Sequence, residues 1–298
     1  MSSTALVLVL AAAVCHAAWN IVAHGVSRIG MPFLWWGAVA STVVWLPAVP
    51  LTGGLGGASA AEFALAAAVS AVLHCAYMLV LQRGYATGRL STVYAVARGT
   101  GPTITVLVAV TLLGERPSPA ALVGIAAIIV AVVAMGVIDR PSGADAPGPR
   151  APGPHGRRRL DPGIGWGLLT GVAIAAYTVW DAHAVREWAV APVAFMVGCT
   201  VGEIVLFSAG LGGRWRELGA VARNHWGRIA AFGVLSPLAY ILVLAAITMA
   251  PVALVAPLRE ISVVLVSVFG ALVLREGRAG ARIAASAVVV AGIVLMTA

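Results

Sequence analysis

The sequence predicts an all-α integral membrane protein of about ten transmembrane helices, arranged as two inverted five-helix repeats. Three observations support this fold class. Hydrophobic residues make up 61% of the chain and charged residues only 10%, whereas a soluble domain carries about 25% charged residues. Ten apolar segments are each close to the roughly 20 residues that a spanning helix needs. Finally, polar landmarks recur in the two halves at one constant offset of 161 residues.

Charged residues and Gly- or Pro-rich breaks separate the ten predicted spans. They are residues 4–24, 31–52, 61–82, 92–113 and 118–138 in the first half, and 163–184, 191–211, 226–248, 252–274 and 279–297 in the second. The first span lacks the basic residues that begin a signal peptide, so we expect a permanent helix. Residues 139–162 are rich in Pro, Gly and Arg and lack apolar periodicity, which is typical of a solvated linker. The predicted domains are a first repeat (4–138), this linker, and a second repeat (163–297).

The repeat rests on three pairs of equivalent polar positions. They are Trp19 and Trp180, Arg98 and Arg259, and Glu115 and Glu276. Because each repeat has an odd number of spans, the second must enter the membrane from the opposite side. Inverted repeats are found in many secondary transporters, which bind substrate near the midplane where the repeats meet.

The arginines indicate an orientation. Fifteen of the nineteen follow odd-numbered spans, and only Arg116 and Arg186 follow even-numbered ones. Basic loops stay in the cytoplasm, so this bias predicts a cytoplasmic linker and both termini outside.

Each half carries the same series of motifs. A Trp-Asn or Trp-Asp pair comes early, and a tyrosine lies in the third span (Tyr77 or Tyr240). A proline-bearing fourth span of the first half ends in LLGE at 112–115, and Gly124 and Gly136 lie in its fifth span. The second half has LVLREG at 272–277, where Arg275 replaces the glycine before the glutamate.

On these motifs each half resembles an EamA domain, the repeat of the drug/metabolite transporter superfamily. The resemblance covers nearly the whole chain except the linker. It implies a central cavity lined by both repeats, alternating access, and export of small metabolites or amino acids. It also implies cytoplasmic termini, which is opposite to the arginine bias.

Arg98 and Arg259 each lie about seven residues inside an apolar span, beside Pro102 and Pro257. A charge at the bilayer centre costs roughly 2.5 kcal/mol or more, so it needs a partner or a watered cavity. In one interpretation the two arginines stand at paired kinks and bind an anionic group of the substrate. In the other they are structural, with Arg259 beside Glu260 and Arg98 against Glu203 or Asp181.

Asp181 and Glu203 are candidates for proton coupling, because water favours the ionised form of a carboxyl group and burial favours the neutral one. A fixed ion pair with an arginine is the alternative. Other candidates for the cavity lining are aromatic or polar residues at repeated or adjacent positions. They are Trp19, Asn20, Trp180, His74, Tyr77 and Tyr240, together with the ionisable Arg98, Asp181, Arg259 and Glu260.

Two further groups of residues receive structural interpretations. Glu115 and Glu276 end the fourth and ninth spans, and we expect each to cap the helix that follows. Cys15, Cys75 and Cys199 have no metal-ligand spacing, and neither His16 nor His74 has a metal-ligand companion. We therefore expect no metal site and no cofactor.

These patterns favour a secondary transporter in the cytoplasmic membrane over other classes. The chain lacks the acidic or nucleophilic cluster of a multi-span enzyme and the P-loop of an ATP-driven pump. A channel, or a membrane-embedded protein that does not transport (a multi-span enzyme or an accessory subunit), stays open as an alternative. Expected partners are the lipid bilayer and a small solute, with no nucleic acid, and the chain is a monomer or a homodimer.

Overall fold

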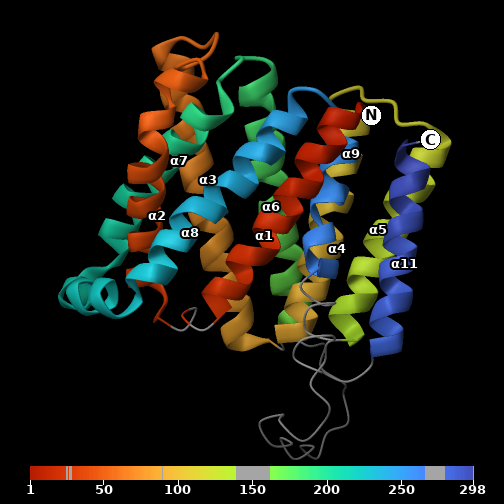
Figure 1. The fold of residues 1–298 in the computed structure, drawn as a ribbon. Coiled ribbons are helices and arrows are strands. Elements are labelled where there is room, and N and C mark those ends of the chain that lie inside the picture. Colours follow the sequence, from red (N-terminus) through yellow and green to blue (C-terminus); the bar gives the residue numbers. More distant parts are fainter. Residues whose placement is uncertain (25, 27–28, 89, 139–161, 266–278, 298) are drawn as a thin grey trace, which may run out of the picture.

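The computed structural model describes residues 1–24, 26, 29–88, 90–138, 162–265 and 279–297, and these ranges form a bundle of helices (Figure 1). Its named α-helices are α1 (Ser3–His24), α2 (Met31–Trp45), α3 (Ala60–Thr87), α4 (Leu90–Thr111), α5 (Pro119–Ile138), α6 (Pro162–Arg186), α7 (Pro192–Gly210), α8 (Leu218–Ile247), α9 (Val252–Arg259) and α11 (Ala279–Thr297). Each predicted span therefore contains a helix, which confirms the fold class. The linker residues 139–161 lie outside the described ranges.

Two spans differ from their predicted extent. The second span ends as an α-helix at Trp45 and continues as 3₁₀ turns at Leu46–Ala48 and Pro50–Thr52, because Pro47 and Pro50 lack the N–H that an α-helix requires. The ninth span stops at Arg259, and the chain makes a turn at Glu260 before helix resumes over 261–265. The remainder of that predicted span, 266–274, lies outside the described residues.

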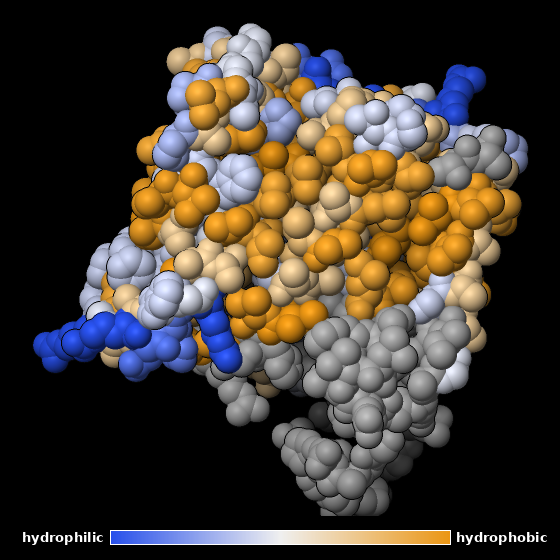
Figure 2. Space-filling view, in the orientation of Figure 1, coloured by the Kyte–Doolittle hydropathy of each residue, from blue (hydrophilic) through white to orange (hydrophobic). Residues whose placement is uncertain are grey.

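The exterior of the bundle is apolar across its middle. Figure 2 shows an apolar band on the visible face between two more polar ends. Large aliphatic side chains are exposed on many helices, including Val43, Leu107, Val130, Val205 and Val290, each at least 59% exposed. Seven described helices are long and apolar enough to cross a membrane. Exposed aliphatic side chains on a soluble surface would be costly in such number, so this belt faces lipid.

The helix contacts follow an inverted twofold arrangement. The helices α1, α2 and α3 are equivalent to α6, α7 and α8. α1 packs on α8, and the equivalent pair α6 and α3 also pack on each other; likewise α2 packs on α8, and α7 packs on α3. The equivalent helices α2 and α7, α4 and α9, and α5 and α11 contact each other directly. In Figure 1, α1 runs from the face that holds both termini, whereas α6 begins at the opposite face, where α5 ends. This arrangement is the one expected from two repeats of opposite direction.

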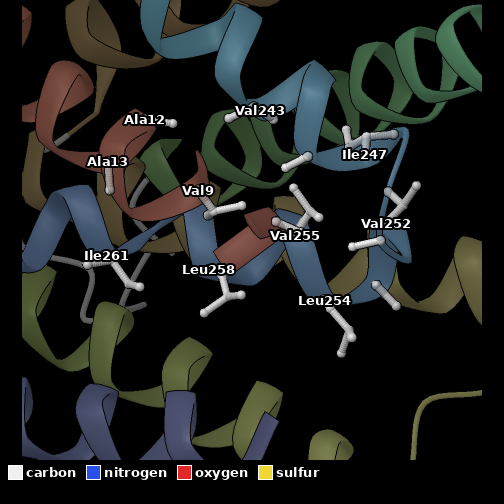
Figure 3. Close-up of a cluster of buried hydrophobic side chains, with 14 of the residues drawn as sticks. Val9, Ala12, Ala13, Val243, Ile247, Val252, Leu254, Val255, Leu258 and Ile261 are labelled. Carbon is white, nitrogen blue, oxygen red and sulfur yellow. The ribbon is translucent and has the colours of Figure 1, made fainter. Parts of the chain in front are cut away.

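The apolar core lies where α1, α8 and α9 meet. Figure 3 shows Val9 of α1, Val243 of α8 and Leu258 of α9 among the side chains of this buried cluster. These three side chains are at most 2% exposed. α9 is buried along its whole length, so its short helix is held by packing from both repeats rather than by its own length.

The two repeats are also bonded to each other at the face of the termini. Gly56, in the loop after α2, forms an antiparallel bridge with Val190 in the loop after α6. Arg186 at the end of α6 donates a 2.6 Å hydrogen bond to Glu115 of the first repeat. Both contacts join segments far apart in sequence, so they close this end of the bundle.

Glu115 caps a different helix from the one expected. Its carboxylate accepts hydrogen bonds of 2.9 Å from the backbone N–H groups of Val252 and Ala253, in the first turn of α9. The expectation of a cap on the following helix, α5, was therefore wrong. The N-cap residue of α9 is Pro251, which has no side-chain acceptor to offer, so the acid from the other repeat satisfies the exposed donors. Glu276 lies outside the described residues.

We predict that Gly124→Ala will destabilise the contact between α5 and α11. A Cβ at Gly124 would lie 2.5 Å from the carbonyl oxygen of Gly292, and backbone cannot move aside as a side chain can. The expected cost is about 1–3 kcal/mol of unfolding free energy, measured by chemical unfolding in mixed micelles. Gly165→Ala is the control, because its Cβ would meet nothing within 4 Å. Equal stability of the two variants would contradict the close packing of α5 and α11.

Candidate functional site

A cavity of about 180 Å³ lies between the two repeats. Its wall is made by α1, α2, α3 and α4 of the first repeat and by α6, α7, α8 and α9 of the second. Trp19 near the end of α1 and Leu34 near the start of α2 both line it. Met196, in the second turn of α7, and Val243, one turn before the end of α8, also line it. The cavity therefore extends along the interface between the repeats rather than lying at one end of it.

Both mid-span arginines line this cavity, and one carboxylate serves both. The Nη1 of Arg98 donates a 2.9 Å hydrogen bond to Oε2 of Glu260, and the Nε of Arg259 lies 3.8 Å from Oε1 of the same carboxylate. Glu260 is only 2% exposed. Arg98 comes from the first repeat and Glu260 from the second, so the ion pair joins the repeats at the cavity wall. Of the partners considered for Arg98, neither Glu203 nor Asp181 forms this pair.

The expected paired kinks exist in one repeat only. α4 continues without interruption from Leu90 to Thr111 around Pro102, whereas α9 ends at Arg259, two residues after Pro257. The interruption places Glu260 at the end of α9, with its backbone N–H bonded to the carbonyl oxygen of Pro257. Because the chain turns there, Arg259 and Glu260 both reach the region between the repeats.

A second polar network surrounds His74 of α3. Its Nε2 lies 3.7 Å from Oδ2 of Asp181 on α6, and its Nδ1 lies 3.5 Å from Oε1 of Glu203 on α7. The hydroxyl of Tyr240 on α8 donates a hydrogen bond to Asp181. Asp181 is fully buried, while Glu203 and His74 line the cavity. Both acids proposed for proton coupling thus face the same imidazole.

Sequence reasoning missed Tyr177, which connects the two networks. Its hydroxyl accepts a 3.3 Å hydrogen bond from Arg259, and its ring centroid is 4.4 Å from that of His74 in an edge-on contact. Tyr77 and Tyr240 also pack edge-on against it. The sequence could have indicated Tyr177, because it lies four residues before Asp181 and the two side chains therefore share one face of α6.

Aromatic rings line part of the cavity wall. The Nε1 of Trp19 donates a 3.3 Å hydrogen bond to Nδ1 of His16, and its ring packs edge-on against Phe232. The Nε2 of His16 is buried and has no hydrogen-bond partner among the described residues. The wall therefore combines apolar rings with one polar atom, Nε2 of His16, that bonds to no described residue.

The structure distributes the predicted cavity residues between the wall and the layer behind it. Six line the cavity: Trp19, His74, Tyr77, Arg98, Tyr240 and Arg259. Asp181 and Glu260 lie behind the wall and bond to residues on it. Asn20 and Trp180 have other contacts: Asn20 donates to the carbonyl oxygen of His16, and Trp180 donates to that of Ala66 on α3. These two bonds satisfy their polar groups within the helix packing.

Cys199 of α7 is close to His74 and Glu203, a grouping that sequence spacing did not predict. Its Sγ lies 3.3 Å from Nδ1 of His74 and 3.9 Å from Oε1 of Glu203. The three side chains are the one described group of His, Cys and acidic residues whose geometry suits a metal ion. His74, which was expected to have no metal-ligand companion, therefore lies close to two potential ligands in the structure.

A helical membrane bundle with a polar cavity between inverted halves defines a polytopic membrane protein. Residues 161–298 match the EamA-like transporter family, and this match over the second half supports an EamA-type member of the drug/metabolite transporter superfamily. No curated protein matches the chain. Among solved structures, one described only as a crystal structure of a protein aligns with a TM-score of 0.74 and 18% identity, over 100% of this chain and 97% of the other. At that identity the likeness shows the fold alone.

We predict that the Arg98–Glu260 pair is strongly coupled. Arg98→Met leaves the buried carboxylate of Glu260 with one distant partner, so we expect the free energy of unfolding to fall by about 3–5 kcal/mol. Adding Glu260→Gln in the double variant should restore part of this loss. The coupling energy from a double-mutant cycle in unfolding experiments should exceed about 1.5 kcal/mol.

The matched control for this cycle is Arg214→Met with Glu217→Gln. That pair has a 2.7 Å contact, but both side chains are more than 40% exposed. Its coupling should stay below about 1 kcal/mol. Similar coupling energies for the two pairs would mean that the Arg98–Glu260 contact is not a buried ion pair.

Proposed function

We propose that this chain is a secondary transporter that exports a small, amino-acid-like solute across the cytoplasmic membrane by alternating access. The observation that carries the proposal is the cavity between the repeats, lined by Arg98 and Arg259 on one side and by Glu203 on another. A solute with a carboxylate and an ammonium group matches both signs of charge. The match of residues 161–298 to a transporter family supports the general activity.

The cavity dimensions favour a small solute over a drug-sized one. Pockets for drug-sized ligands measure about 300–1,000 Å³, and this cavity is about 180 Å³. The cavity is also lined by the rings of Trp19, Tyr77, Tyr177, Phe232 and Tyr240, and the faces of such rings carry negative partial charge. Such rings accept a cationic group by cation–π attraction, which again suits an amino-acid-like solute.

The closed end of the bundle supports alternating access. Glu115, Arg186 and the bridge at Gly56 join the repeats at the face of the termini. If the termini are outside, as the arginine bias predicts, these contacts close the side to which an exporter releases its solute. Opening this end requires the contacts between the repeats to separate.

We predict that transport depends on both cavity arginines. Arg98→Met and Arg259→Met should each reduce uptake of carboxylate-bearing solutes into inside-out vesicles by at least tenfold, because a guanidinium that holds a carboxylate by two hydrogen bonds is lost. Uptake is normalised to folded protein measured by size-exclusion chromatography.

Arg223→Met is the control, because Arg223 is exposed and does not line the cavity. Undiminished uptake in folded Arg98→Met and Arg259→Met would contradict the proposed site. An absence of flux for every solute with folded wild-type protein would instead favour the alternative, a membrane protein that does not transport.

We also predict that a proton gradient drives accumulation. Uptake by inside-out vesicles with an acidic lumen should exceed uptake without a gradient, and Glu203→Gln should remove this difference while solute exchange continues, since an amide cannot carry a proton. Glu217→Gln is the control, as this acid is exposed and paired with Arg214. Equal gradient dependence in Glu203→Gln and wild type would exclude Glu203 as the coupling acid and leave Asp181.

A further inference from the structure

His74, Cys199 and Glu203 form a compact group of three chemically different ligands. Cys199 and Glu203 are four residues apart on α7, which places them on one face of that helix, and His74 faces them from α3. Cys199 is fully buried, whereas His74 and Glu203 line the cavity. The group is therefore enclosed on its sulfur side and accessible from the cavity on the other.

The spacing of the ligand atoms fits a tetrahedral metal ion. With about 2.3 Å from zinc to sulfur and 2.0–2.1 Å to nitrogen or oxygen, tetrahedral angles place the ligand atoms about 3.3–3.6 Å apart. The observed separations are 3.3 Å from Nδ1 of His74 to Sγ of Cys199, 3.5 Å from Nδ1 to Oε1 of Glu203, and 3.9 Å from Sγ to Oε1. Movements of a few tenths of an ångström would complete the geometry.

The surroundings of the group resemble the outer shell of a metal site. A metal-bound histidine commonly directs its second nitrogen at a carboxylate, and Nε2 of His74 lies 3.7 Å from Asp181. Tyr240 donates to that carboxylate, and its second oxygen is buried without a hydrogen-bond partner among the described residues. The hydroxyl of Ser70 lies 3.6 Å from Sγ of Cys199, where it can donate to a thiolate.

We propose that His74, Cys199 and Glu203 bind one thiophilic divalent cation of the Zn²⁺ class, with a fourth position open to the cavity. A thiolate beside an imidazole selects such ions over Mg²⁺ and Ca²⁺, which require oxygen ligands. On binding, the thiol of Cys199 loses its proton to water in the cavity. Because His74 belongs to the first repeat and the other two ligands to the second, the ion joins the repeats.

The test uses the purified full chain in detergent, titrated with Co²⁺ and then with Zn²⁺. We expect a thiolate-to-cobalt charge-transfer absorption and tetrahedral d–d bands that saturate at one equivalent of Co²⁺ and disappear when Zn²⁺ is added. Cys199→Ser should lose the charge-transfer band, whereas Cys15→Ser and Cys75→Ser should keep it. Binding is measured without transport, so the result does not depend on the proposed function.

Two variants that retain the thiol cover the case in which Cys199→Ser fails to fold. Glu203→Gln removes an anionic ligand and should weaken Co²⁺ binding at least tenfold, and Asp181→Asn should weaken it about 10–100-fold as an outer-shell change. Glu217→Gln should bind as wild type does. Absence of the band in wild type, its persistence in Cys199→Ser, or unchanged affinity in Glu203→Gln would overturn the proposal.

Discussion

The need to neutralise charge inside a low-dielectric bundle constrains the centre of this protein. Arg98 and Arg259 cannot remain unpaired among apolar helices, and the carboxylate of Glu260, 2% exposed, lies between them. The break at the end of α9 makes this possible, since a continuous helix would direct consecutive side chains 100° apart. The ion pair therefore depends on the break in the helix, and the cavity lies beside both.

The inverted duplication explains why the site is shared between repeats. Each half offers an incomplete set of groups: the first contributes Arg98 and His74, and the second contributes Glu260 and the acids that face His74. Equivalent helices contact each other across the arrangement. Relative motion of the repeats would change the distances within both polar networks. A carrier needs such a change to couple the binding of its solute to the side on which the cavity is exposed.

Much of the fold could be predicted from sequence, and less of the site. Span positions follow from apolar length alone, so all ten segments contain helix. The offset of 161 residues located Arg98 and Arg259, which both reach the cavity. The side-chain partners of these arginines could not be predicted, because contacts between helices depend on the rotation of each helix about its axis. Tyr177, Cys199 and the cap from Glu115 to α9 all arise across helices, whereas Trp180, a repeated landmark, donates to the backbone of α3 instead.

The cap that Glu115 provides for α9 has a consequence for how salt acts on this protein. One of its partners, the side chain of Arg186, is 36% exposed, so counterions reach this contact from the water at the face of the termini. The Debye length falls from about 10 Å at 0.1 M to 3 Å at 1 M salt, and the attraction weakens with it. The ionic strength of that one compartment therefore affects the strength of this contact, while the Arg98–Glu260 pair, with side chains 16% and 2% exposed, is screened less.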